Sequence, residues 1–220
     1  MQLYVDTANL KEIEIVNEMG IISGVTTNPS LLAKEDPSLD IKELILDIHK
    51  KVGGHLSVEV ISTDAKGMLE EAEEILKWFP EATIKIPMIP NGLAAVKELS
   101  RQGIPTNVTL IFTAAQALAA NNAGASYVSV FLGRLDDISS DGMQPVKDTC
   151  EIWDRHGLES MIIAASIRHP IHVLECAKAG ADIATVPFKV LQQMLKHPLT
   201  DSGVQSFLND HAKMMKEKGV

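Results

Sequence analysis

This chain of 220 residues has few of the features that define several common classes of protein. The two cysteines, Cys150 and Cys176, are too few for a disulfide framework, and neither belongs to a CxxC pair or to a zinc-ligand spacing. No uncharged apolar run approaches the roughly 18 residues that a membrane-spanning helix needs. The first residues contain Asp6 and no basic-then-apolar stretch, so they do not resemble a signal peptide. We therefore expect a cytoplasmic protein.

Positive charge is scarce as well. The chain has 20 lysines and arginines against 29 aspartates and glutamates, which gives a formal charge of −9. Nucleic-acid binding draws most of its affinity from clustered basic side chains, so we expect neither a nucleic-acid nor a membrane partner. A small anionic substrate needs only one or two well-placed arginines. The four candidates are Arg101, Arg134, Arg155 and Arg168.

Apolar residues make up 45% of the chain, which is enough for a packed core, and short strand-like runs alternate with longer helix-like ones throughout. From Asp6 to Val186 the chain advances 180 residues in seven intervals, about 26 per unit, which is the period of a βα repeat. The eight predicted strands are Gln2–Asp6, Gly24–Thr27, Leu56–Ile61, Thr83–Met88, Thr106–Phe112, Tyr127–Leu132, Met161–Ser166 and Ile183–Pro187. Eight such units predict an α/β fold that is a closed (β/α)8 TIM barrel.

A doubly wound open sheet is the alternative, but the turn after the first strand, residues 6–9, lacks the glycines of a phosphate-binding loop. No linker divides the chain, so residues 1–220 are expected to form one domain. Residues of about 200–217 predict an extra C-terminal helix, capped by Thr200 or Asp201 and carrying an apolar stripe. We expect this helix to pack on its own barrel or on a neighbouring subunit.

Alternation along each strand predicts an unusually polar barrel interior near one end. Val58 and Val60 are expected to face the helices, so Glu59 between them points inward. Lys85 likewise points inward, because Ile84 and Ile86 on either side of it face outward. In the fifth strand, Val108 and Leu110 are expected to face outward. The polar side chains expected at the strand ends are Asp6, Thr27, Asn28, Glu59, Lys85, Asn107, Thr109, Ser129, Ser166 and Arg168.

Two carboxylates and an ammonium group inside a barrel require an explanation, because a buried charge is costly unless it is paired. A purely structural ion pair is the simpler interpretation, but polar residues at seven strand ends favour a catalytic one. Burial disfavours the charged form of an amine, and a neutral amine attacks a carbonyl to give an iminium that can accept electrons from a breaking C–C bond. Lys85 is therefore the candidate nucleophile, with Glu59 and Asp6 as candidate acid–base groups.

This chemistry requires no metal. His169 and His172 could share a ligand at their spacing of three, but the seven histidines together form no metal signature. We expect a satisfied pair at the surface and predict no metal site.

Five segments resemble the transaldolase family, and more narrowly its short subfamily, which includes fructose-6-phosphate aldolases. They are Val5-Asp6-Thr7-Ala8-Asn9, Gly24-Val25-Thr26-Thr27-Asn28-Pro29-Ser30, Lys85-Ile86-Pro87-Met88, Thr106-Asn107-Val108-Thr109 and Ala164-Ala165-Ser166-Ile167-Arg168. The resemblance covers essentially the whole chain. It implies a (β/α)8 barrel, no cofactor, and transfer of a dihydroxyacetone unit from a ketose phosphate to an aldose phosphate.

The resemblance also implies a role for each matching residue. Lys85 matches the Schiff-base lysine, Asp6 the carboxylate that deprotonates the donor hydroxyl, and Glu59 with Thr109 the pair that holds a catalytic water. The residues matched to the dihydroxyacetone unit are Asn28, Asn107 and Ser129, and those matched to a phosphate clamp are Arg134, Ser166 and Arg168. Thr27 and Phe131 are expected to border the same substrate.

Two positions separate the branches of this family. The aldolase branch has glutamine where this chain has Glu59 and tyrosine where it has Phe131, so both positions here resemble transaldolases. An aldolase that releases free dihydroxyacetone and a non-catalytic sugar-phosphate-binding barrel stay open as alternatives. Short-chain relatives form pentamers or pairs of pentamers, which implies a homo-oligomer. The preferred sugar phosphates do not follow from the sequence.

Overall fold

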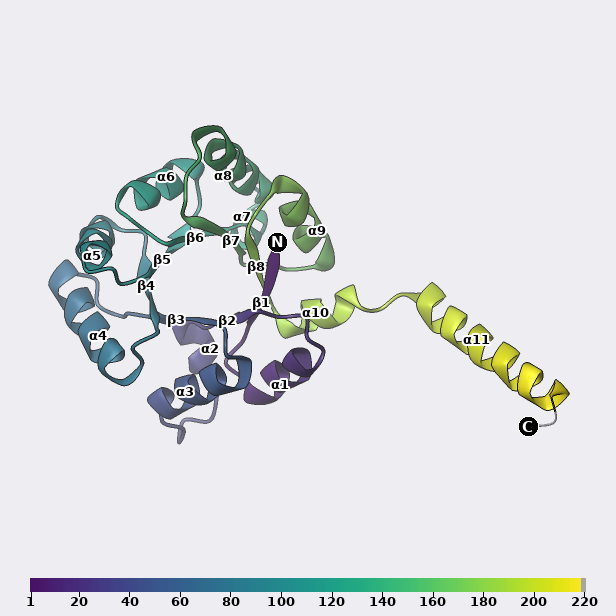
Figure 1. The fold of residues 1–220 in the computed structure, drawn as a ribbon. Helices are drawn as coiled ribbons and strands as arrows, with labels where there is room; N and C mark the ends of the chain where they lie inside the picture. The colour runs from purple at the N-terminus through teal and green to yellow at the C-terminus, as the bar shows by residue number, and fades with distance from the viewer. Residues whose placement is uncertain (219–220) are drawn as a thin grey trace.

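The computed structural model describes residues 1–218, and these residues form a closed barrel of eight parallel strands, as predicted (Figure 1). The observed and predicted strands differ by at most two residues at either end. The strands are β1 (Gln2–Asp6), β2 (Gly24–Thr26), β3 (His55–Glu59), β4 (Thr83–Pro87), β5 (Thr106–Ile111), β6 (Tyr127–Phe131), β7 (Met161–Ala165) and β8 (Ile183–Val186).

Helices form the outer layer of the barrel, and their ends follow the local sequence (Figure 1). Asp64 caps the fourth helix by accepting a hydrogen bond from the Gly67 amide at 2.9 Å, and Gly103 follows the fifth with a φ of 74°. The helices are α1 (Leu10–Glu18), α2 (Pro29–Leu32), α3 (Ile41–Val52), α4 (Ala65–Trp78), α5 (Pro90–Arg101), α6 (Ala114–Asn122), α7 (Gly133–Asp136), α8 (Met143–His156), α9 (Pro170–Ala179), α10 (Phe188–Met194) and α11 (Pro198–Glu217). None of the helices described is both long and apolar enough to cross a membrane.

The main core lies between the strands and the helices, where outward strand residues such as Ile84 and Ile86 are fully buried. A smaller cluster fills the interior at the amino-terminal ends of the strands. It consists of Tyr4, Ile163 and Ile183, with Tyr127 and Met161 packed against them. This apolar floor closes one end of the barrel and leaves the carboxyl ends of the strands for polar side chains.

The expected outward direction of Leu110 is wrong. The pairing between β5 and β6 shifts register between Val108 and Ile111, and Leu110 has a left-handed φ of 61°. Such a bulge breaks the strict alternation of side chains on which the prediction depended. Leu110 consequently lines the cavity at the mouth of the barrel.

The C-terminal helix α11 extends away from the barrel, and none of its residues is buried (Figure 1). It begins at Pro198, two residues before the expected start near residue 200, because the His197 side chain rather than Thr200 or Asp201 caps it by accepting from the Leu199 amide. Its apolar stripe is exposed in this protomer, with Phe207 at 76% and Leu208 at 60% of their full exposure. The last two residues of the expected domain, 219 and 220, lie outside the described residues.

The close approach of α5 to β4 depends on Gly92. A Cβ at this position would lie 2.2 Å from the carbonyl oxygen of Pro87 and 3.1 Å from Cγ2 of Ile86. We expect Gly92→Ala to cost about 1–3 kcal/mol by overpacking, which lowers Tm by roughly 2–12 °C in a chain of this size. The matched control is Gly203→Ala in α11, where no atom lies within 4 Å and alanine favours the helix. Equal Tm values for the two variants, measured by calorimetry, would contradict this packing.

Candidate active site

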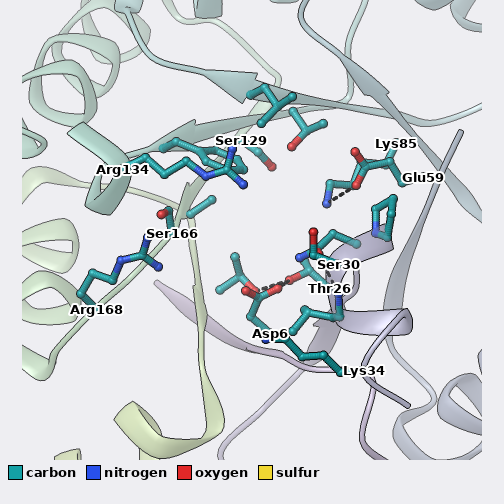
Figure 2. A pocket seen from close by; sticks show the side chains of 18 residues that line it. Asp6, Thr26, Ser30, Lys34, Glu59, Lys85, Ser129, Arg134, Ser166 and Arg168 are labelled. Carbon is teal, nitrogen blue, oxygen red and sulfur yellow. Dashed lines mark hydrogen bonds and ion pairs between the residues drawn. The ribbon is translucent and has the colours of Figure 1, made fainter. Parts of the chain in front are cut away.

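A cavity of about 490 Å³ opens at the carboxyl ends of the barrel strands, a size typical of small-molecule sites. Ten of the twelve predicted site residues line it, and the other two, Thr27 and Asn107, do not. The lining residues are Asp6, Thr26, Asn28, Pro29, Ser30, Leu31, Lys34, Glu59, Lys85, Thr109, Leu110, Ser129, Phe131, Arg134, Ala165, Ser166, Arg168 and Thr185. Figure 2 shows how their side chains converge.

Lys85 and Glu59 form an ion pair inside this cavity. The two residues are directly opposite each other in the register of β3 and β4, and Nζ of Lys85 lies 2.9 Å from Oε2 of Glu59 (Figure 2). The Lys85 side chain is 8% exposed and that of Glu59 is 15% exposed. A carboxylate that touches the buried amine is therefore placed to take a proton from it.

The backbone after β2 holds the same amine from the other side. Nζ of Lys85 donates a hydrogen bond to the carbonyl oxygen of Thr27 at 2.9 Å. Thr27 is 1% exposed, and its side chain does not line the cavity. Thr27 thus differs from the prediction, because it reaches the site through its carbonyl group and not through its hydroxyl. Asn28 does line the cavity, and its side chain caps α2 by accepting from the Leu31 amide at 3.0 Å.

Asp6 points into the cavity from the end of β1, next to the hydroxyl of Thr26. Thr26 donates to Oδ1 of Asp6 at 2.8 Å and is also hydrogen-bonded to the hydroxyl of Thr185 (Figure 2). Burial raises the pKa of Asp6. The hydrogen bond from Thr26 and the charges of Lys85 and Arg168 lower this pKa, so they partly offset the effect of burial. Asp6 is therefore a carboxylate with an increased tendency to hold a proton.

Two arginines lie on the side of the mouth away from Lys85 (Figure 2). The guanidinium group of Arg134 lies over the ring of Phe131, with Cζ 5.1 Å from the ring centroid. The guanidinium group of Arg168 instead lies 2.9 Å from Asp137. Cations in this position can bind the phosphate of a substrate whose other end reaches the amine.

Gly133 allows α7 to pack directly beneath these groups. Its amide donates to the carbonyl oxygen of Ser166 at 3.1 Å, and a Cβ there would lie 2.0 Å from that oxygen and 2.7 Å from Cγ of Arg168. Ser166 itself has a left-handed φ of 64°. Residues held in this region cost about 1–3 kcal/mol and concentrate at functional sites.

The cavity combines a buried amine that is paired with a carboxylate, a second carboxylate nearby, and arginines at the mouth. This set of groups suits Schiff-base chemistry on a phosphorylated carbonyl compound. The sequence profile described as Transaldolase/Fructose-6-phosphate aldolase matches residues 3–219. The chain belongs to this family.

Named relatives agree with that assignment over nearly their whole length. A probable transaldolase of Clostridium botulinum (strain Eklund 17B / Type B) is 58% identical over 216 residues, which are 98% of this chain and 100% of that protein. Probable transaldolase 1 of Listeria monocytogenes is 58% identical over 210 residues, 96% of this chain and 97% of that one. A probable transaldolase of Moorella thermoacetica is 57% identical over 214 residues, 97% of this chain and 99% of that one.

Eight residues of the transaldolase-family cavity were missed from the sequence. They are Thr26, Pro29, Ser30, Leu31, Lys34, Leu110, Ala165 and Thr185. Thr26 could have been found, because a strand residue directly opposite Asp6 in register shares its face. Leu110 could not, because only the bulge turns it inward. Ser30 lies in α2 and Lys34 in the turn after it, where the alternation of a strand does not apply.

Asn107 lies behind the wall of the transaldolase-family cavity. It is fully buried, and its amide joins the hydroxyl groups of Ser57 and Ser129. His172, which the sequence grouped with His169, lies 3.0 Å from Asp136 through Nε2 and accepts from the Arg168 amide through Nδ1 at 3.3 Å. His169 is exposed as expected, but His172 is buried, so the expectation of a surface pair is wrong for His172. His172 thus supports the segment that carries Arg168.

The raised pKa of Asp6 predicts that this side chain lowers the stability of the folded protein although catalysis needs it. The folded state prefers the protonated form, so above that pKa the ionised carboxylate lowers stability. We expect Asp6→Asn to raise Tm at neutral pH by about 2–4 °C, the shift that ~1 kcal/mol gives in a chain of this length. This gain should shrink as the pH falls, because Asp6 then takes up its proton.

The same substitution should lower C–C cleavage by about 10²-fold or more, the range of a lost acid–base group. The matched control, Asp154→Asn on the exposed face of α8, should change neither quantity. If Asp6→Asn destabilises the protein at neutral pH, the burial argument for Asp6 is wrong.

Proposed function

We propose that the protein is a transaldolase that transfers a dihydroxyacetone unit between sugar phosphates in the non-oxidative pentose phosphate pathway. The donor would be fructose 6-phosphate or sedoheptulose 7-phosphate, and the acceptor glyceraldehyde 3-phosphate or erythrose 4-phosphate. The observation that carries this proposal is the buried Lys85 amine in contact with Glu59 at the base of a cavity with arginines at its mouth.

The reaction begins when Lys85 becomes a neutral amine. A proton passes from Nζ to Oε2 of Glu59, and the freed lone pair attacks C2 of the ketose. After the attack, the nitrogen passes a second proton to the former carbonyl oxygen, which gives the neutral carbinolamine. Glu59 then returns its proton to this hydroxyl group, which leaves as water and gives the iminium. Thr109 lies on the adjacent strand and lines the same cavity, so we assign it, with Glu59, to hold that water.

The iminium then accepts electrons from the C3–C4 bond. Asp6 removes the proton of the C4 hydroxyl, the bond breaks, and the electron pair moves into the iminium to give an enamine and a free aldehyde. The enamine attacks the acceptor aldehyde, Asp6 returns its proton to the new hydroxyl, and water releases the product ketose from Lys85. The raised pKa of Asp6 favours its holding the proton between these two transfers.

The side chains of Asn28 and Ser129 are assigned to the hydroxyl groups of the bound dihydroxyacetone unit, since both line the cavity. Phe131 supports the choice of a transferase over an aldolase. A phenyl ring cannot hold a water by hydrogen bonding, so the enamine of Lys85 stays unhydrolysed until an acceptor arrives. The aldolase branch has a tyrosine at the position of Phe131.

A coupled assay tests the proposal. With fructose 6-phosphate and erythrose 4-phosphate, we expect continuous formation of glyceraldehyde 3-phosphate and sedoheptulose 7-phosphate. Without erythrose 4-phosphate, formation should stop near one turnover, because the enamine has no acceptor. Continuous formation in both mixtures would show an aldolase. Binding of fructose 6-phosphate with no turnover in either would show a non-catalytic barrel.

Arg134, Ser166 and Arg168 are proposed to bind the phosphate. A hydrogen bond to a charged group contributes about 1.5–3 kcal/mol, so Arg168→Ala should lower kcat/KM for erythrose 4-phosphate by roughly 10- to 150-fold. The loss should be much smaller with unphosphorylated glyceraldehyde as acceptor. Arg155→Ala on the exposed part of α8, where Arg155 pairs with Glu151, is the control and should have no effect. An equal loss with both acceptors would show that Arg168 does not bind the phosphate.

We also propose a homo-oligomer, a pentamer or a pair of pentamers, in which α11 packs on a neighbouring copy. The support is the exposed stripe of α11, since Phe207 and Leu208 have no cover in this protomer. Phe207→Asp should lower the native mass measured by light scattering, whereas Asn209→Asp on the same helix adds the same charge and should not. An unchanged mass for Phe207→Asp would contradict a role for α11 in assembly.

The proposed compartment is the cytoplasm. Cys150 and Cys176 are free and buried, and burial raises the pKa of Cys150 to about 11 and that of Cys176 to about 12. Both thiols are therefore protonated and unreactive near neutral pH, which fits a reducing environment.

A further inference from the structure

The two arginines of the proposed phosphate site belong to different loops of the barrel. Arg134 lies in the short helix α7, between β6 and α8, and Arg168 lies between β7 and α9. Figure 2 shows their side chains on the same side of the mouth, with Ser166 between them. One phosphate group can bind both guanidinium groups only if the two loops keep a fixed relative position.

Contacts at each end of α7 join these two loops. At its start, the amide of Gly133 donates to the carbonyl oxygen of Ser166 at 3.1 Å. At its end, Oδ2 of Asp136 lies 3.0 Å from Nε2 of His172, a residue in the first turn of α9. The other ring nitrogen of His172, Nδ1, accepts a hydrogen bond from the amide of Arg168 at 3.3 Å. The imidazole therefore bridges α7 and the backbone of Arg168.

The roles of the two ring nitrogens follow from their partners. A backbone amide can only donate, so Nδ1 is the unprotonated nitrogen that accepts from Arg168. The neutral ring then carries its hydrogen on Nε2, next to the carboxylate oxygen of Asp136. Burial and the neighbouring His169 lower the pKa of His172, and Asp136 opposes them only in part. The ring is therefore neutral near pH 7.

Both ends of this bridge are held in place. His172 is 7% exposed, and Oδ1 of Asp136 accepts from the Gly142 amide at 3.0 Å, just before α8. The bond to the Arg168 amide by itself would be an ordinary cap, because it satisfies a backbone group that precedes α9. Capping does not explain the contact between Nε2 and Asp136, which belongs to the preceding βα unit. That contact ties the position of one loop to the other.

We propose that His172 is a positioning residue of the phosphate site, which holds Arg134 and Arg168 at the separation that a phosphate group requires. His172 does not line the cavity, so it acts through the two loops and not through contact with substrate. This inference rests on the proposed function, because that function assigns a phosphate to the two arginines. It makes His172 a determinant of specificity, since an acceptor without a phosphate gains nothing from the fixed arginines.

The first test is independent of activity. In protein labelled with 15N at histidine, the resonances of His172 are assigned by their loss in His172→Asn. At pH 7 we expect the neutral tautomer, with a proton on Nε2 and an unprotonated Nδ1. A proton on Nδ1, or a doubly protonated ring, is incompatible with the bond from the Arg168 amide and would overturn the proposal.

The second test compares two acceptors, erythrose 4-phosphate and unphosphorylated glyceraldehyde, with the same donor. His172→Phe keeps an aromatic ring but removes both contacts of the bridge. We expect kcat/KM for erythrose 4-phosphate to fall by roughly 2- to 13-fold, the worth of one hydrogen bond, and that for glyceraldehyde to stay within about twofold. His172→Asn should recover part of the loss, because its Oδ1 is as many bonds from Cβ as Nδ1 and can accept from the Arg168 amide.

His169→Phe is the matched control. His169 is exposed, its ring centroid lies 3.7 Å from that of His172, and its replacement should leave the ratio of the two acceptors unchanged. Because His172 acts through Arg168, adding His172→Phe to Arg168→Ala should cost less than about twofold further. Equal losses with both acceptors in His172→Phe, or its full loss on top of Arg168→Ala, would indicate a merely structural role and would overturn the proposal.

Two further measurements cover the remaining outcomes. If His172→Phe does not fold, Asp136→Ala breaks the same bridge at its more exposed end and should change the acceptor ratio in the same direction; an unchanged ratio would overturn the proposal. If the unsubstituted protein transfers nothing to either acceptor, the proposed function fails, and calorimetry with inorganic phosphate decides on His172. Weaker phosphate binding by His172→Phe than by His169→Phe would support the bridge, and equal binding would overturn it.

Discussion

The ion pair between Lys85 and Glu59 is the interaction on which the rest of this structure depends. Two charges removed from water are costly, and they persist only where partners surround them. The closed barrel provides these partners, because β3 and β4 place the two side chains in direct register and the turn after β2 adds the carbonyl of Thr27. The amine is thereby kept in one position, next to a proton acceptor.

The barrel interior is divided into two levels that serve this pair. Its floor is apolar and aromatic, and it shields the site from water on one side. Its upper level is polar, and hydrogen bonds join His55 to Ser57, Ser57 to Asn107 and Asn107 to Ser129, which links the two levels. The least regular backbone lies at the mouth, where Leu110 and Ser166 adopt left-handed conformations. Two of the left-handed residues, Leu110 and Ser166, therefore border the cavity, while the regular parts of the strands fix the reacting groups.

Most of the fold follows from sequence periodicity, because βα units of about 26 residues with alternating strands have few ways to close. Strict alternation also found Lys85, Glu59 and Ser129, since each belongs to a regular strand. It failed for Leu110, where a bulge changes the register, and it could not reach Lys34, which lies in a turn. The direction of α11 also escaped prediction, because an apolar stripe indicates that a helix needs a partner but not which surface covers it.

The central claim, that Lys85 is the nucleophile of a transaldolase-family barrel, is tested most directly by trapping the iminium. Protein incubated with fructose 6-phosphate is reduced with borohydride, digested and analysed by mass spectrometry. The account predicts the added mass of a reduced dihydroxyacetone unit on the peptide that contains Lys85, and no such mass in Lys85→Met. The adduct on a different lysine, or an adduct of the same yield in Lys85→Met, would contradict it.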